Sequence, residues 1–140
     1  MLEATDMPHA QATVRVLIVD DQASFRRAAR SVVDLTPGFV VVGEVETGED
    51  SLDTARTLRP DLVLMDVHLP GIDGLEASRR MLDAGETQPP VILLLSTEEP
   101  GEYADDLMDC GAAAYLGKAE FGSESLSAAW AAAIESTSGS

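Results

Sequence analysis

The sequence contains a single cysteine, Cys110, so a disulfide framework is excluded. A lone thiol is ordinary in a reducing compartment, and we expect a cytoplasmic protein. No stretch approaches the ~18 consecutive apolar residues that a membrane span requires, because the longest such run is Ala128 to Ile134. Residues 1–11 lack the basic and apolar regions of a secretory signal. These absences favour one globular domain of 140 residues that does not enter a membrane.

Positive charge is also scarce. The chain has 25 acidic and 9 basic residues, a formal net charge of −16 and a pI near 4.1. Solubility accounts for much of this acidity, but such a field also repels nucleic acid phosphates, so we expect no direct nucleic-acid binding. Eight of the basic residues are arginines between Arg15 and Arg80, and Lys118 is the only lysine.

Several catalytic and binding motifs are missing as well. The sequence has neither the glycine-rich loop that binds nucleotide phosphates nor the one that binds dinucleotides. It contains no Gly-x-Ser-x-Gly nucleophile turn. The two histidines, His9 and His68, have no partners at a spacing suited to zinc. Any catalytic or ligand-binding site must therefore be built from residues outside these motifs.

Apolar, β-branched runs alternate with helical patterns, which predicts an α/β fold with right-handed crossovers and a parallel sheet. We expect strands over 14–19, 39–45, 62–65, 91–95 and 112–116. Helices are expected over 25–35, 48–58, 75–84 and 102–110, with a fifth starting after Gly122 or Ser123. The pattern predicts that the first helix buries Leu35 on its apolar face and that Gly85 caps the third. Residues 14–135 form the predicted domain, between tails over 1–13 and 136–140.

Polar residues gather where the expected strands end. Asp20 and Asp21 follow the first strand, Asp66 the third, Ser96 the fourth and Lys118 the fifth. Any one such aspartate is ordinarily a helix cap or a turn residue. As a set, however, they meet at one edge of a parallel sheet, where ligands bind. Three carboxylates repel one another unless a cation is present, and Mg²⁺ prefers oxygen ligands of this kind.

These segments resemble the response-regulator receiver family over about residues 14–134. The motifs that carry the resemblance are Val16-Leu17-Ile18-Val19-Asp20-Asp21, the segment from Asp61 through Met65-Asp66 to Leu69-Pro70-Gly71-Ile72-Asp73-Gly74, Pro90 to Ser96, and Gly111 to Lys118. The resemblance implies a flavodoxin-like (βα)5 sandwich with strand order 2-1-3-4-5. It also implies a phosphoryl-accepting signalling domain of two-component systems, which is not an enzyme acting on other substrates.

The resemblance further implies a role for each site residue. Asp66 is expected to accept a phosphoryl group from a sensor histidine kinase, and Lys118 to bind that group. Asp21, Asp66 and the main-chain carbonyl of His68 are expected to hold Mg²⁺, with Asp20 acting directly or through water. By the same resemblance, Ser96 is the switch hydroxyl and Tyr115 the switch aromatic.

The sequence departs from the family pattern near the site. Ala119 stands where many members have proline, and Thr97 where a small residue is usual. His68 and Glu98 flank the route of attacking water, so the phosphoryl lifetime stays open. Two other functional interpretations also stay open. A Mg²⁺-dependent phosphatase with an aspartyl nucleophile usually has a second aspartate at the position of His68, and a pseudo-receiver would bind partners without phosphorylation.

Output is expected on the face formed by the helix over 102–110, the fifth strand and the fifth helix, acting on an output domain or a partner protein. A homodimer stays open, but not through salt bridges on this face, because the fifth helix has no arginine or lysine. A basic partner surface suits its acidic side chains better. Arg26, Arg27 and Arg30 are candidates for docking a kinase, against the alternative of ordinary solvated surface.

Overall fold

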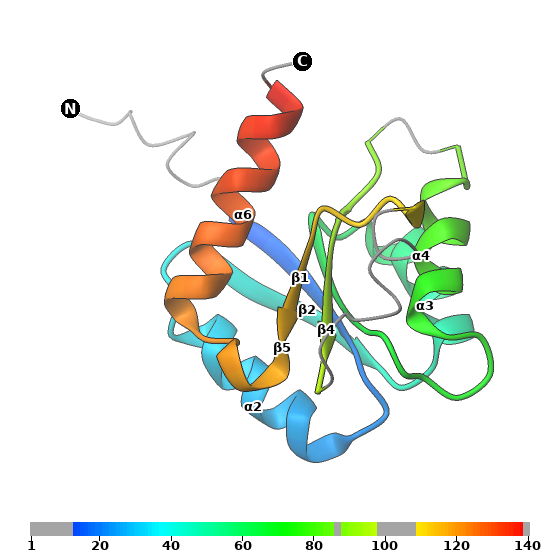
Figure 1. Cartoon of the computed structure of the whole chain (residues 1–140), viewed down its shortest axis with the longest axis horizontal. Helices are drawn as coiled ribbons and strands as arrows, with labels where there is room; N and C mark the ends of the chain where they lie inside the picture. The colour runs from blue at the N-terminus through cyan, green and yellow to red at the C-terminus, as the bar shows by residue number, and fades with distance from the viewer. Residues whose placement is uncertain (1–12, 86–87, 98–108, 139–140) are drawn as a thin grey trace.

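A computed structural model of the chain describes residues 13–85, 88–97 and 109–138. Its strands are β1 (Val14–Val19), β2 (Phe39–Val45), β3 (Leu62–Asp66), β4 (Val91–Ser96) and β5 (Ala114–Gly117). Its α-helices are α2 (Ala23–Asp34), α3 (Gly48–Leu58), α4 (Gly74–Leu82) and α6 (Ser123–Ser138), with a short 3-10 helix, η3 (Lys118–Glu120). Strands and helices alternate along the chain, as the sequence pattern predicted (Figure 1).

The five strands form one parallel sheet in the order β2-β1-β3-β4-β5, which confirms the predicted fold class. The order reverses between β1 and β3, whose pairing runs from Val16 opposite Leu62 to Val19 opposite Met65. The residues that follow these two strands therefore meet at the switch point of the sheet, where open α/β folds bind ligands.

Helices cover both faces of the sheet (Figure 1). Leu17 and Val19 of β1 belong to the core that packs against α3 and α4. Val16 and Ile18, which alternate with them, belong to the core under α2 and α6. Strands buried on both faces need apolar residues at nearly every position, and this explains the nearly all-apolar runs that identified β1, β3 and β4 in the sequence.

Several element boundaries differ from those expected by one or more residues, and one residue expected in the core is exposed. Leu35 is 76% exposed, because the buried stripe of α2 continues from Val33 to Thr36, which hydrogen-bonds the Val32 carbonyl and is 2% exposed. Helix α4 ends at Leu82 with Asp83 as its C-cap, so Gly85 does not cap it. Strand β5 begins at residue 114 instead of 112 and pairs with β4 from Leu93 onward. Helix α6 continues through residue 138, into the expected tail.

The fourth expected helix, over 102–110, lies outside the described residues except for its last two positions. Among the described helices, none is long and apolar enough to cross a membrane.

Candidate functional site

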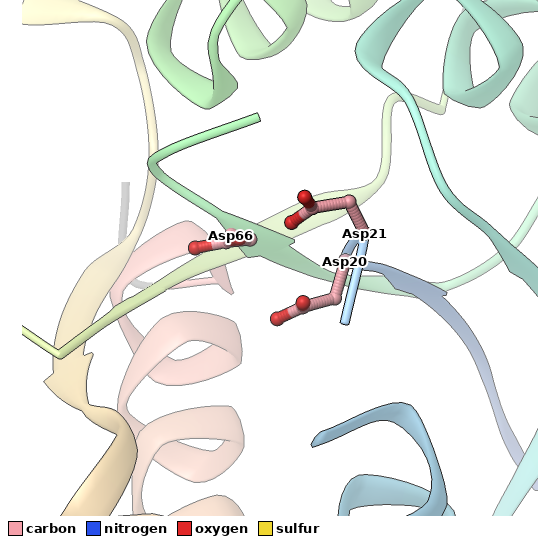
Figure 2. A group of neighbouring side chains, drawn as sticks. All are labelled: Asp20, Asp21 and Asp66. Carbon is pink, nitrogen blue, oxygen red and sulfur yellow. The ribbon is translucent and has the colours of Figure 1, made fainter. Parts of the chain in front are cut away.

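Three carboxylates meet at the carboxyl ends of β1 and β3. Asp20 and Asp21 follow β1, and Asp66 is the last residue of β3. One oxygen from each lies within 4.8 Å of the others (Figure 2). Asp20 is 1% exposed and Asp66 4% exposed, whereas Asp21 is open to solvent. The neighbouring parallel strands β1 and β3 bring residues 46 positions apart into one cluster, as the sequence predicted.

Lys118 supplies the positive charge of this cluster. It follows β5 as the first residue of η3, and its Nζ lies 2.7 Å from Asp20 Oδ2 and 3.6 Å from Asp66 Oδ1. Its side chain is 9% exposed, so the ammonium is largely removed from water. One ammonium balances only one of the three carboxylates, and the cluster keeps an excess of negative charge.

The donor set fits a hard divalent cation. It offers carboxylate oxygens at the edge of the sheet, which are the ligands that Mg²⁺ prefers. Among the described residues, Asp20 Oδ2 is the buried side-chain atom that has no hydrogen-bond partner. Its contact with Lys118 at 2.7 Å is an ion pair that lacks hydrogen-bond geometry. A divalent cation at this site would share the oxygen with the Lys118 ammonium, directly or through a bound water.

The pKa of Asp66 reflects the same crowding. Burial of the carboxylate and the negative charge of Asp20 are the largest causes that raise this pKa from 3.8 to about 6. Lys118 and the backbone N–H of His68 oppose the shift, and Asp21 adds to it. A nearby cation would reverse the balance and keep Asp66 ionised.

The segment after Asp66 is held close to the strand. His68 N donates to Asp66 Oδ1 at 3.3 Å, and Gly74 N donates to the Val67 carbonyl at 2.8 Å. A Cβ on Gly74 would lie 2.1 Å from the Asp66 carbonyl oxygen, so only glycine fits there. Asp73 caps α4 by accepting from Glu76 N. The sequence motif Gly71-Ile72-Asp73-Gly74 is thus explained by a tight return from β3 into α4.

Arg26 supports the segment after β1 and was not recognised from the sequence as part of the site. Its Nη1 donates to the Asp20 carbonyl at 2.8 Å, and its guanidinium lies 3.3 Å from Glu44 and 3.9 Å from Glu46. Because its side chain is 16% exposed and already engaged, Arg26 does not suit the kinase-docking role considered above. Arg30 also pairs with Glu44, at 2.6 Å.

The two expected switch residues lie on the neighbouring strands. Ser96 is the buried last residue of β4, one position beyond the Leu95 that pairs with Asp66. Tyr115 of β5 pairs with Leu94 and is partly buried against the core on the α3 and α4 side. Thr97 is exposed at the end of β4, and the side chain of His68 is exposed beside Asp66.

Phe25 is a second residue that sequence reasoning missed at the site. Lys118 Nζ lies 4.5 Å from the centroid of its ring. The sequence offered one signal, an aromatic residue in the first turn of the helix that follows Asp20 and Asp21.

Comparison with known proteins agrees with this geometry. A sequence model described as the response regulator receiver domain matches residues 16–130. Response regulator GacA of Pseudomonas aeruginosa is 41% identical over 105 residues, which cover 75% of this chain and 48% of GacA. Response regulator UvrY of Escherichia coli is 38% identical over 115 residues, covering 82% of this chain and 52% of UvrY.

Solved structures show the same likeness. The signal receiver domain of the putative response regulator NarL from Mycobacterium tuberculosis superposes with a TM-score of 0.79 at 28% identity, covering 87% of this chain and 97% of that one. This chain spans about half the length of the curated relatives it matches. Because the family model covers most of the sequence, the chain belongs to the family of response regulator receiver domains.

Proposed function

We propose that Asp66 accepts a phosphoryl group from the phosphohistidine of a sensor histidine kinase, with Mg²⁺ as the cofactor. The observation that carries this proposal is the position of Lys118, whose ammonium lies between the buried carboxylates of Asp20 and Asp66. Folding alone gives no reason to bury two carboxylates side by side, because burial and their mutual repulsion raise the pKa of Asp66. A site for transferring an anionic group does give one.

In the proposed transfer, a carboxylate oxygen of Asp66 attacks phosphorus. The P–N bond of the phosphohistidine breaks, its electron pair returns to the imidazole nitrogen, and Asp66 becomes an acyl phosphate. Lys118, whose Nζ lies 3.6 Å from Asp66 Oδ1, offsets the charge of the phosphoryl oxygens. Asp66 must be ionised to attack, so the groups that favour its charged form also favour the reaction.

The residues that would hold Mg²⁺ are Asp21, Asp66 and the main-chain carbonyl of His68, with Asp20 contributing directly or through water. When bound, Mg²⁺ neutralises charge on the transferring phosphoryl group and keeps Asp66 ionised. Arg26 holds the carbonyl of Asp20, and its two glutamate partners fix the guanidinium to β2 and the residue after it. The oxygen ligands thus lie within two residues of the carboxyl ends of β1 and β3, two neighbouring strands of the sheet.

Phosphorylation adds about −1.5 to −2 charges at the end of β3. We propose that Ser96 moves toward this charge and that Tyr115 turns inward with it. The affected face comprises β5 and α6, and the remaining part expected from the sequence, over 102–110, lies outside the described residues except for its last two positions. The α6 segment contains no arginine or lysine, which argues against a salt-bridged homodimer there and for a basic partner surface.

The output is proposed to be a second domain or a partner protein. The curated relatives are about twice as long as the stretch that matches this chain. The remaining half of each relative is long enough for a further domain. We also propose that this domain acts in the cytoplasm, where its single cysteine stays a reduced thiol, and signals without catalysing turnover of other substrates.

The test is incubation with phosphoramidate and Mg²⁺, followed by intact mass and phosphate release. We expect one phosphoryl adduct that is absent in Asp66→Asn and retained in Asp53→Asn, whose side chain is 80% exposed on α3. Steady turnover of phosphate esters would instead support an aspartyl phosphatase. Failure to form any adduct, with Mg²⁺ and donor in excess, would support a pseudo-receiver and overturn the proposal.

A further inference from the structure

The ammonium of Lys118 has an aromatic partner in addition to its two carboxylates. Nζ lies 4.5 Å from the ring centroid of Phe25, well within the range of a cation–π interaction. Phe25 comes from α2, on the face of the sheet that also carries α6. The ammonium therefore lies between two carboxylates from β1 and β3 and an aromatic ring from a third element.

The same ring holds the turn that carries Lys118. Phe25 packs against Phe121 with centroids 6.3 Å apart and ring planes at 48°. Phe121 directly follows η3, and its N–H donates to the Lys118 carbonyl at 3.3 Å. Phe25 thus contacts both the charged end of Lys118 and the residue that closes the turn around its backbone.

We propose that Phe25 is a positioning residue for phosphoryl transfer, which holds the ammonium of Lys118 in place through a cation–π contact. This inference rests on the proposed function of Asp66. The ring presents its negative face to a cation that is 9% exposed, and desolvation strengthens such an interaction. It keeps the ammonium beside Asp66 Oδ1 without adding an oxygen that would compete with the incoming phosphoryl group.

A carboxylate in place of the ring would hold the ammonium more tightly but would also raise the negative charge that repels the phosphodonor. An aliphatic residue would fill the space without attracting the charge. A neutral aromatic ring gives attraction without either cost, because its quadrupole binds a cation while its net charge stays zero.

The decisive experiment replaces Phe25 with phenylalanines that carry one, two or three ring fluorines. Fluorination weakens the negative ring face in steps while changing the size of the side chain little. We expect the rate constant for phosphorylation by phosphoramidate to fall stepwise, by about three- to tenfold in total, with little change in Mg²⁺ affinity. The same series at Phe39, which meets Trp130 edge-on at 6.3 Å, should leave the rate unchanged.

A second measurement reports the contact itself. Because Lys118 is the only lysine, isotope-labelled lysine gives one set of side-chain NMR signals. In the intact chain its ε-protons should be shifted upfield by the Phe25 ring, and Phe25→Leu should remove that shift. A rate that does not respond to fluorination, or an unshifted lysine signal, overturns the proposal.

The two hypotheses fail in different ways. If the chain formed no adduct on Asp66, the proposed function would be wrong. The lysine signal would still show whether the Phe25 ring contacts the Lys118 ammonium. If the adduct formed at the same rate across the fluorinated series, the function would stand and the positioning role of Phe25 would fall.

Discussion

Lys118 Nζ lies 2.7 Å from Asp20 Oδ2, and this ion pair joins the residue after β5 to the residue after β1, across the two intervening strands β3 and β4. The pair is almost fully buried, so removing one partner leaves an uncompensated charge. The contribution of this ion pair to stability, and whether a metal ion can replace the Lys118 charge, can be tested directly.

Lys118→Met should destabilise the fold by about 3 kcal/mol in the absence of divalent ions, because two buried carboxylates lose their cation. Saturating Mg²⁺ should recover much of this loss, since an ion that binds only the folded state stabilises it. Phosphorylation should slow on the order of a hundredfold even with Mg²⁺ present. Denaturant unfolding with and without Mg²⁺ checks the first two expectations.

The matched control is Arg80→Met, which removes a cation paired with Glu76 on the exposed side of α4. It should cost no more than about 0.5 kcal/mol, with no dependence on Mg²⁺. Equal losses for the two variants would contradict a special role for the buried pair.

Asp66→Asn should stabilise the protein in a pH-dependent manner. The pKa of Asp66 is raised from 3.8 to about 6, so the folded state binds the proton more tightly than the unfolded chain. The stability that this group contributes is therefore lost as pH rises through that window, and the penalty is complete above about pH 6. Removing the charge should add on the order of 2 kcal/mol at pH 7.5 without Mg²⁺.

The gain in stability should shrink toward pH 4, where Asp66 is protonated and therefore uncharged in the parent protein. Thermal unfolding of both proteins from pH 4 to pH 8 measures the difference. A stabilisation of the same size at both ends of that range would mean that the pKa of Asp66 is not the cause.

Gly74→Ala should be strongly destabilising. The added Cβ would lie 2.1 Å from the Asp66 carbonyl oxygen, a backbone atom that cannot move without displacing Asp66 itself. We expect a loss of about 3 kcal/mol or more and little phosphorylation of the protein that remains folded. Gly122→Ala is the control, because a Cβ there meets nothing within 4 Å. Circular dichroism melts and the phosphoramidate assay distinguish the two variants.

Most of the fold followed from the sequence because its signals were local. Strands β1 and β2 were predicted with their observed bounds. The nearly continuous apolar run of β1 is largely buried, and β2 is a β-branched run at the edge of the sheet that is only partly buried. Leu35 was placed inside because it is apolar, but the helical period carries the buried stripe to Thr36. A polar residue can occupy such a position when its hydroxyl is satisfied, as Thr36 is by Val32 and Ser123.

The site was predictable only in part. Strand ends of a parallel sheet must meet at one edge, so Asp20, Asp66 and Lys118 could be brought together by topology alone. The contacts of Phe25 and Arg26 depend on how α2 packs over that edge, and no motif encodes them. Arg26 in particular resembled surface charge, because the glutamate that holds it lies 18 residues away on β2.

Arg26→Met should weaken the site more than Arg30→Met, although both arginines pair with Glu44. Arg26 also donates to the Asp20 carbonyl and is 16% exposed, whereas Arg30 is 47% exposed and no contact of its side chain reaches Asp20 in the described part of the chain. We expect a loss of about 1–2 kcal/mol for Arg26→Met and less than about 0.5 kcal/mol for Arg30→Met. The Mg²⁺ dissociation constant, measured by titration, should rise severalfold only in Arg26→Met, because its loss frees the segment that carries Asp20 and Asp21. If both variants bound Mg²⁺ alike, the link from Glu44 through Arg26 to the carboxylates would have no bearing on the metal site.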